Sequence, residues 1–443
     1  MKRLIYQRLI EWKIKSNRKP LILEGARQTG KTYILKEFGK KEFKKLIYCN
    51  FEQDPNLKTF FESSLTPKKI IESLSIYFDA DIKPDEALIF FDEIQESNLA
   101  LNSLKYFCED APEYAVVAAG SLLGVKMSVP KSFPVGKVEL MQLYPMNFSE
   151  FLQAYGKERY LNMLGNTDSV EPFPELLHNE LCDILRKYYF VGGMPEAVSE
   201  FLLSGSYDKV RAIQENILRS YELDFAKHAN SSDVPKISII WDSIPLFLSR
   251  ENKRFTFSAI SKSARAREYE TAIMWLVDAG LIHKVTGIEH LEQPLTAFPE
   301  ESAFKIYVLD VGLLGALARL KPEILVNGNE LFTTFNGAFV ENYVVQQLIS
   351  AGNKKLYYWR SESRKAEIDL LVEHEMLILP LEIKAGINAK SKSLSVYSDK
   401  YKPKLLLRTT LLNLKYNGDI LNVPLYAMNS LRHYLSLIGT SSS

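Results

Sequence analysis

Cysteine is scarce in this 443-residue sequence, which contains only Cys49, Cys108 and Cys182. Three widely spaced cysteines, an odd number, provide neither a disulfide framework nor the closely spaced pairs of a zinc site. Reduced and buried thiols are the expected state of such cysteines. The sequence therefore argues against a small secreted fold that is stabilised by disulfides.

Long apolar runs are also missing. No uninterrupted apolar stretch reaches the roughly 18 residues that are needed to span a bilayer. The N-terminal segment MKRLIYQRLIEWKIKSNRKP mixes charged side chains with its apolar positions, so it lacks the apolar core and the cleavage site of a signal peptide. We therefore expect a cytoplasmic protein that has no membrane partner.

An excess of charge of one sign is absent overall but present locally. The formal net charge is +1, yet residues 1–50 contain 14 Lys and Arg against 4 Asp and Glu, and residues 51–130 contain 6 against 14. From residue 341 to the end the count is 14 against 9, an excess that is compatible with polyanion binding. A charge run is more often a solvated face. Charge alone therefore leaves two alternatives open, a DNA-binding surface and an ordinary solvated surface.

The length predicts several domains, because about 150 residues per domain is typical. The first part alternates short apolar runs (PLILEG, KLIYCNFE, ALIFFDE, YAVVAAGS) with helical patterns, which is typical of a parallel sheet with helical crossovers. A helical stretch follows, then a helix–helix–strand pattern that resembles a winged helix-turn-helix, then a last α/β layer. The predicted boundaries of these four parts are 1–145, 146–232, 233–325 and 326–443.

A phosphate-binding loop is predicted from GARQTGKT, which fits G-x-x-x-x-G-K-[ST] and lies between an apolar strand and a helix. Gly25 and Gly30 allow the backbone to curl around phosphates, Lys31 reaches the β and γ oxygens, and the Thr32 hydroxyl serves as a ligand of Mg²⁺. The residues expected to bind ATP are Gly25, Ala26, Arg27, Gln28, Thr29, Gly30, Lys31, Thr32, Tyr33, Asp92 and Ser121.

Two adjacent carboxylates follow the buried run LIFF. Asp92 is placed to hold Mg²⁺, and Glu93 to orient and polarise the attacking water, so that Glu93 and Lys31 are the expected catalytic residues of an ATPase. Ser121, at the end of the next apolar strand, is suited to sensing the γ-phosphate. The alternative reading is that these polar groups simply terminate strands.

Together the P-loop, FFDEIQ, AAGSLLG, LYPMNFSEF and YYFVGGMPEAV resemble the AAA+ ATPases of a bacterial and archaeal family with a C-terminal DUF4143 region. The resemblance implies an α/β fold: a P-loop AAA+ core with a helical lid, a winged helix-turn-helix and a C-terminal restriction-endonuclease-like domain. It also implies self-association through the core. Relatives usually have Gly-Arg before the LYP segment, whereas this chain has Gly136 and Lys137, and lysine cannot form the bidentate fork of an arginine finger.

The segment EYETAIMWLVDAGLI carries the predicted recognition helix. Ala272, Trp275, Leu276 and Ala279 share one helical face, which predicts a packing surface. Arg265 and Arg267 could contact DNA, but Glu268 and Glu270 follow directly and would repel phosphate. Protein packing and DNA contact remain equal alternatives for this part.

A second metal site is predicted near the C-terminus. Asp369 lies on the strand EIDLLVE, Glu382 and Lys384 share one face of the next strand, and Glu341 lies on an upstream helix. Converging carboxylates favour a cation, and oxygen ligands favour Mg²⁺ or Mn²⁺, with Lys384 stabilising the transition state. The order looks like the PD-(D/E)xK nuclease signature, although Ile368 replaces its proline. The alternative is an ion-pair lattice at the end of a sheet.

Two functions therefore remain open. In the first, ATP hydrolysis gates Mg²⁺-dependent cleavage of phosphodiesters at the C-terminal site. In the second, the chain is an ATP-switched module, and its inactive nuclease fold only binds DNA or a protein partner.

Overall fold

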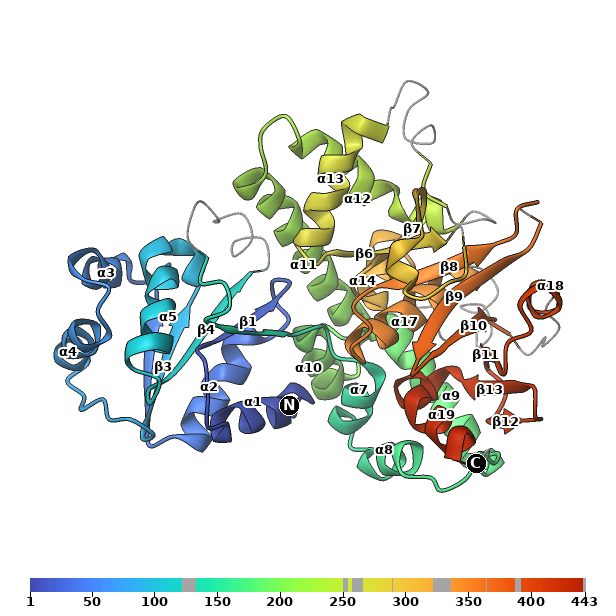
Figure 1. Cartoon of the computed structure of the whole chain (residues 1–443), viewed down its shortest axis with the longest axis horizontal. Coiled ribbons are helices and arrows are strands. Elements are labelled where there is room, and N and C mark those ends of the chain that lie inside the picture. Colours follow the sequence, from blue (N-terminus) through green and yellow to red (C-terminus); the bar gives the residue numbers. More distant parts are fainter. Residues whose placement is uncertain are drawn as a thin grey trace. The chain divides into compact units, whose positions relative to one another are not determined.

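The structure is a computed structural model of the full chain (Figure 1). It describes residues 1–121, 133–249, 254–256, 266–288, 290–321, 336–363, 365–386 and 392–440. The chain divides into two compact units. The first comprises Met1–Tyr144 with Asp278–Leu281, and the second comprises Pro145–Val277 with Ile282–Ser443. Among the described residues, no helix combines the length and the apolarity that crossing a membrane requires.

The first unit is built on a five-stranded sheet with the order β2-β3-β4-β1-β5, in which every neighbouring pair is parallel. The central strands are apolar and buried on both faces, as expected where helices cover both sides of a parallel sheet. The strands are β1 (Leu21–Gly25), β2 (Lys45–Asn50), β3 (Ala87–Asp92), β4 (Ala115–Ser121) and β5 (Glu139–Gln142).

Helices pack on both faces of this sheet, which places one apolar core on each side. One core receives side chains from α1 (Ile5–Ile14) and α2 (Lys31–Glu42). The other receives them from α3 (Thr59–Ser63), α4 (Pro67–Tyr77) and α5 (Asn98–Asp110). Two short 3₁₀ turns, η1 (Pro55–Lys58) and η2 (Ile94–Glu96), complete this unit. The predicted parallel sheet of the ATPase core is therefore confirmed.

The second unit contains an eight-stranded mixed sheet with the order β12-β13-β11-β10-β9-β8-β6-β7. Its strands β8 to β10 form an antiparallel meander, and β11 and β13 continue from β10 in parallel. The strands are β6 (Ile282–Ile288), β7 (Pro299–Val308), β8 (Leu356–Arg360), β9 (Glu367–His374), β10 (Leu377–Ile383), β11 (Leu406–Thr410), β12 (Lys415–Tyr416) and β13 (Ile420–Pro424).

The helices of the second unit precede, separate and follow its strands. They are α7 (Phe148–Ala154), α8 (Glu158–Gly165), α9 (Glu175–Val191), α10 (Pro195–Ser204), α11 (Tyr207–His228), α12 (Val234–Leu248), α13 (Ala266–Asp278), α14 (Val311–Leu317), α17 (Asn336–Ser350), α18 (Lys392–Tyr401) and α19 (Leu431–Thr440), with 3₁₀ turns η4 (Leu295–Ala297) and η5 (Leu425–Ser430).

The two strands of the predicted winged helix, β6 and β7, do not form a separate domain sheet. Strand β6 pairs antiparallel with β7 on one side and parallel with β8 on the other, with Val285 opposite Leu356. Strands β6 and β7 thus share one sheet with strands β8 to β13, which follow the predicted boundary at 325. The edge of β6 that does not face β7 is hydrogen-bonded to β8. The local sequence pattern does not predict this long-range pairing.

Two of the sequence motifs form local turns. In LYPMNFSEF, Asn147 and Glu150 make a capping box that starts α7: the Asn147 side chain accepts the Glu150 N–H at 2.9 Å, and the Glu150 carboxylate accepts the Asn147 N–H at 3.1 Å. In YYFVGGMPEAV, Gly192 has φ of 71° and ends α9, and Pro195 opens α10. Both motifs therefore have structural roles.

Asp310 joins these turns to the rest of the second unit. Its buried carboxylate accepts N–H groups from Gly193 at 2.6 Å and Leu313 at 3.0 Å, and the Gln346 amide at 3.1 Å. A Cβ on Gly193 would lie 1.9 Å from the Met146 oxygen, so only glycine fits. Burial raises the pKa of Asp310 to about 6, although its hydrogen bonds oppose that rise. The predicted lid residues 146–232 are thus packed into the same compact unit as the C-terminal sheet.

Candidate functional site

The glycine-rich loop lies between β1 and α2, at the edge of the sheet where the parallel strands end. Gly30 caps α2 with φ of 94°, a conformation that glycine adopts without strain. A Cβ on Gly25 would lie 2.2 Å from the Leu143 oxygen. The buried Thr29 hydroxyl donates to the Ala26 oxygen at 2.9 Å, which closes the loop on itself. The loop is therefore shaped before any ligand binds.

Lys31 points into this loop. Its side chain is buried, and its Nζ donates to the carbonyl oxygens of Gly25 at 3.0 Å and Ala26 at 2.9 Å. Burial lowers the pKa of Lys31 to about 8, although the nearby carboxylates of Glu93 and Asp92 oppose the change. A buried ammonium held by neutral carbonyls is well suited to exchange them for phosphate oxygens, and the residues present fit a nucleoside triphosphate.

Asp92 and Thr32 are in direct contact. Asp92 is buried at the end of β3, and the Thr32 hydroxyl donates to its Oδ2 at 2.9 Å and lies 3.1 Å from its Oδ1. Tyr48, within β2, donates its phenolic hydrogen to the same Oδ2 at 2.8 Å. A hydroxyl and a carboxylate in contact fit the first coordination shell of Mg²⁺ beside phosphates. Tyr48 was not predicted, because a tyrosine inside a strand gives no signal by itself.

Glu93 adopts an unusual backbone conformation for a residue that is not glycine. Its φ of 50° and ψ of 47° lie in the left-handed region, where a side chain is strained. The Gln95 amide donates to its carboxylate. The register of β1 and β4 sets Ser121, the predicted sensor, opposite Gly25. Lys137, the residue in place of the expected arginine, pairs with Glu109 at 2.9 Å.

The other residues that were expected to bind ATP differ in their exposure to solvent. Arg27 is half-buried, and Gln28 is exposed with φ of 64°. Tyr33 is exposed on the first turn of α2. Arg3, a residue that the sequence did not indicate, is buried and donates to the Thr29 oxygen at 3.0 Å and to the Tyr144 oxygen at 2.6 Å. The Arg3 guanidinium therefore connects the loop to the backbone of Tyr144.

The predicted C-terminal residues form ion pairs and hydrogen bonds. Glu382 is buried at the end of β10, and its Oε1 lies 2.7 Å from Lys384 Nζ. Asp369 on β9 accepts the Ile383 N–H at 2.8 Å. Glu341 on α17 is buried and accepts the Tyr307 hydroxyl at 2.8 Å. We call these residues, with Lys305 and Glu367, the C-terminal charge cluster.

Lys305 is the member of this cluster that the sequence did not predict. It lies on β7, with 1% of its side chain exposed, and its Nζ is 2.6 Å from Glu367 Oε1 and 3.9 Å from Glu341 Oε2. Burial lowers its pKa, but the charges of Glu341, Glu367 and Asp369 outweigh burial and raise the pKa overall. Within the described ranges, no three Asp, Glu, His or Cys side chains are arranged to hold a metal ion.

The predicted recognition helix packs through its apolar face. Ala272, Trp275 and Leu276 on α13 are buried, as is Ala279 just beyond it. Arg267 is exposed, whereas Arg265 lies outside the described residues.

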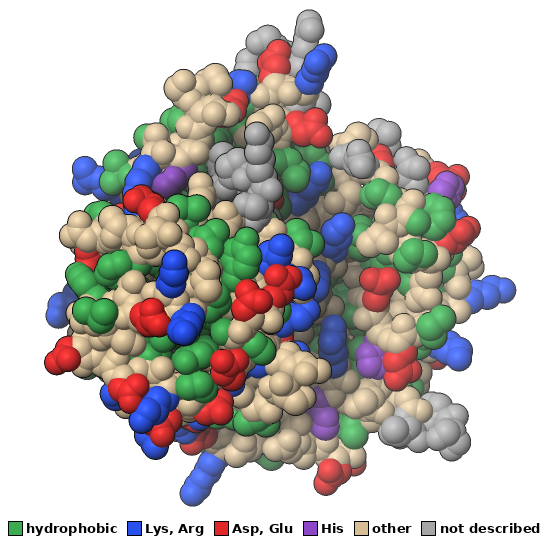
Figure 2. All heavy atoms as spheres, turned by 60° about the vertical axis from the view of Figure 1, so that its left-hand side comes forward, with side chains coloured by type: hydrophobic (Ala, Val, Ile, Leu, Met, Phe, Trp, Pro, Cys, Tyr) green, Lys and Arg blue, Asp and Glu red, His purple; other side chains and the backbone are tan. Residues whose placement is uncertain are grey.

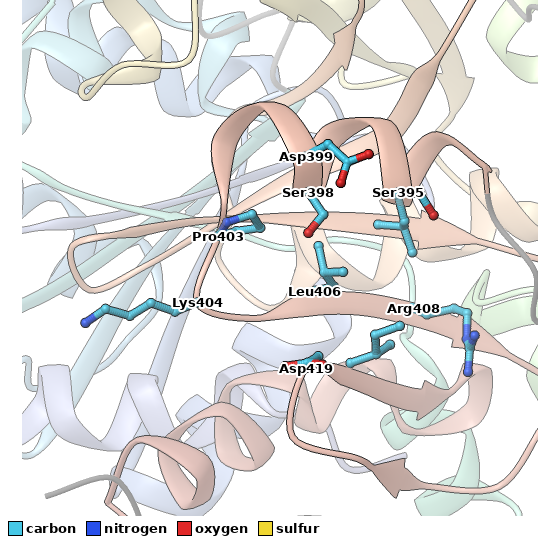
Figure 3. Close-up of a pocket in the computed structure, with 10 residues that line it drawn as sticks. Ser395, Ser398, Asp399, Pro403, Lys404, Leu406, Arg408 and Asp419 are labelled. Carbon is cyan, nitrogen blue, oxygen red and sulfur yellow. The ribbon is translucent and has the colours of Figure 1, made fainter.

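A pocket of about 320 Å³ lies between α18 and the strands β11 and β13 (Figure 3). Its charged lining residues are of both signs, with Arg408 and Lys404 against Asp399 and Asp419. Arg408 donates to the Asn422 oxygen at 3.1 Å. None of the lining residues belongs to either predicted site, and the balanced charges favour no class of ligand.

A parallel sheet whose first strand leads into a phosphate-binding loop, beside a contact between Thr32 and Asp92, defines a P-loop nucleoside triphosphatase core of the α/β class. Residues 17–152 match the AAA domain family, which confirms the predicted AAA core. Residues 336–428 match the domain of unknown function DUF4143, and residues 182–324 match the domain of unknown function DUF8612. The chain thus joins an AAA domain to a C-terminal DUF4143 domain.

Several solved structures are similar to the chain at low identity. A Walker-type ATPase of Pyrococcus abyssi is 15% identical, with 72% of this chain and 95% of that chain covered and a TM-score of 0.44. The ORC2 protein of Aeropyrum pernix is 16% identical, with 75% and 93% covered and a TM-score of 0.30. DnaA of Aquifex aeolicus is 16% identical, with 62% and 86% covered and a TM-score of 0.30. No curated protein matches the chain.

Proposed function

We propose that the first unit binds ATP with Mg²⁺ and hydrolyses it. The observation that carries this proposal is the contact between the Thr32 hydroxyl and the buried Asp92 carboxylate, beside a buried Lys31. These three groups have the chemistry that a metal-bound triphosphate needs, and they meet at one edge of the sheet. The AAA domain match supports the same assignment.

Each residue then has a defined task. Lys31 releases its two carbonyl partners and binds the β and γ oxygens, while the N–H groups of the loop face the phosphates. Thr32 and Asp92 hold Mg²⁺, which when bound neutralises charge on the β and γ oxygens. Glu93 accepts a hydrogen bond from the attacking water and orients it in line with the γ-phosphate. Ser121 contacts the γ-phosphate from the neighbouring strand.

The test is ATP binding by Lys31→Ala. The variant should lose measurable affinity for ATP in an equilibrium titration, because the only buried ammonium of the described part of the loop is removed. Lys40→Ala, an exposed lysine on the same helix, is the matched control and should bind as the wild type does. Retained affinity in Lys31→Ala would contradict the assignment of the phosphate loop.

For the second unit we propose a binding role in place of cleavage. Buried Lys305 approaches Glu341, one of the carboxylates that the nuclease hypothesis assigns to a metal, and pairs with the neighbouring Glu367, which favours the ion-pair lattice. The basic excess after residue 341 supports DNA as the partner. Exposed lysines of this part are Lys354, Lys355, Lys365, Lys392, Lys400, Lys402, Lys404 and Lys415.

DNA binding should weaken steeply with salt, because neutralising phosphates releases counterions. Figure 2 shows acidic and basic side chains intermixed over one face of the molecule. The basic excess from residue 341 on is small, 14 against 9, so a modest number of phosphate contacts is expected. Titration of a labelled duplex at two salt concentrations measures the slope. No binding of the duplex at either salt concentration would favour a protein partner. Cleavage of DNA or RNA with Mg²⁺ or Mn²⁺ would contradict the binding role. Self-association and cytoplasmic location stay predictions.

A further inference from the structure

The C-terminal charge cluster brings four carboxylates to one end of β9 and β10. Glu341 comes from α17, Glu367 and Asp369 from β9, and Glu382 from β10. Asp369 accepts the N–H of Ile383, which lies between Glu382 and Lys384 in sequence, and Glu382 Oε1 lies 2.7 Å from Lys384 Nζ, so these groups meet where β9 and β10 pair. Carboxylates that converge in a largely buried place repel one another unless a cation lies among them.

A cation of the chain itself occupies this place. Lys305 Nζ contacts Glu367 at 2.6 Å and approaches Glu341 at 3.9 Å, and it lies 5.0 Å from the centre of the Tyr358 ring. A lysine with 1% of its side chain exposed requires such partners, because an unpaired buried ammonium would be strongly destabilising. The acids and the lysine therefore stabilise one another.

The oxygen atoms that a metal would need are already engaged. One oxygen of Glu341 accepts the Tyr307 hydroxyl, one of Asp369 accepts the Ile383 N–H, and one of Glu382 pairs with Lys384. Glu382 Oε2 is buried without a hydrogen-bond partner. A single such atom is not the set of several oxygen ligands that Mg²⁺ or Mn²⁺ requires. The residues present do not fit the metal of a PD-(D/E)xK site.

We propose that the Lys305 ammonium takes the place of a divalent metal ion in this cluster, so that the second unit folds and binds its partner without metal. The proposal rests on the binding role proposed above for the second unit and is independent of ATP hydrolysis.

The experiment is a Mn²⁺ titration of the full chain without nucleotide, followed by the electron paramagnetic resonance of free Mn²⁺. All proteins carry Asp92→Asn, which removes the carboxylate that we propose holds Mg²⁺ in the first unit. Lys305→Met keeps the apolar length of the side chain and removes its charge, whereas Lys305→Arg keeps the charge. The parent and Lys305→Arg should bind no Mn²⁺ in the second unit. Lys305→Met should gain one site, at least roughly tenfold tighter than the parent background, because Glu367 and Glu341 then lack the lysine beside them.

Adding Glu382→Gln to Lys305→Met should abolish the gained site. Mn²⁺ binding by the parent that is lost on Glu382→Gln would overturn the proposal, and so would a folded Lys305→Met variant that gains no Mn²⁺. If Lys305→Met does not fold, the comparison of the parent with Glu382→Gln decides: identical titrations support the proposal, and loss of a site overturns it. An inactive ATP site leaves all these titrations unchanged, so the two proposals fail separately.

Discussion

Asp310→Ala should destabilise the second unit, and by an amount that depends on pH. The substitution leaves three donors without their acceptor, those of Gly193, Leu313 and Gln346. An unsatisfied buried donor costs about 1–3 kcal/mol, which gives roughly 3–9 kcal/mol in total. That amount is comparable with the whole free energy of unfolding of a typical domain.

The ionised carboxylate itself opposes folding. The pKa of Asp310 is raised from 3.8 to about 6, chiefly by burial, and this difference corresponds to about 3 kcal/mol at neutral pH. Because the folded pKa is the higher one, the stability that Asp310 contributes is full below pH 3.8 and falls as the pH rises through about 6. The cost of Asp310→Ala should therefore be about 3 kcal/mol smaller at pH 7 than near pH 4.

Urea unfolding followed by tryptophan fluorescence measures this cost at both pH values. Trp241, Trp275 and Trp359 lie in the second unit, and the fourth tryptophan, Trp12, lies in the first. Asp399→Ala, an exposed aspartate of the second unit, is the matched control and should change the free energy of unfolding by under about 0.5 kcal/mol. A cost of Asp310→Ala below about 1 kcal/mol near pH 4, or a cost that grows with pH, would contradict this prediction.

Three further predictions concern the first unit. Arg3→Gln should raise the KM for ATP more than it lowers kcat, because the guanidinium supports the backbone of the loop. Arg8→Gln, at an exposed position of α1, should leave both constants unchanged, and a loss of kcat in Arg3→Gln as large as the rise in KM would count against the role of Arg3. ATP binding should take up protons above about pH 8, since phosphate favours the charged form of Lys31, whose pKa is lowered to about 8; calorimetry in two buffers measures the uptake, and none is expected at pH 6.5. Tyr48→Phe removes one hydrogen bond to Asp92, worth about 1 kcal/mol, and should lower the rate of hydrolysis roughly fivefold; an unchanged rate would mean that the bond does not position Asp92.

The nucleotide site could be predicted because its chemistry is encoded locally. The loop from Gly25 to Thr32 is continuous in sequence, and Asp92 follows a buried strand directly, so strand ends alone bring them together. Arg3 and Tyr48 could not be predicted in the same way. Each acts through a contact with a distant residue, and neither residue type in its local context indicates a role.

The C-terminal charge cluster shows more clearly which contacts cannot be predicted from the sequence. Glu341, Asp369, Glu382 and Lys384 follow a known order, and in the structure Glu382 pairs with Lys384 while Asp369 accepts the N–H of Ile383 between them. Lys305 enters the cluster only because β7 joins the same sheet through β6, a pairing between residues about 70 positions apart in the chain. Local periodicity does not encode such a pairing. The same pairing places the hairpin of the predicted winged helix in the C-terminal sheet.

The most direct test of the account is single-turnover hydrolysis of ATP by the wild type and by Glu93→Gln, with Mg²⁺ present. The account predicts that the wild type releases phosphate, whereas Glu93→Gln binds ATP with similar affinity and releases phosphate at least roughly a hundredfold more slowly, because the water is no longer polarised. A wild type that binds ATP without hydrolysing it, or a Glu93→Gln variant that hydrolyses at the wild-type rate, would contradict the central claim.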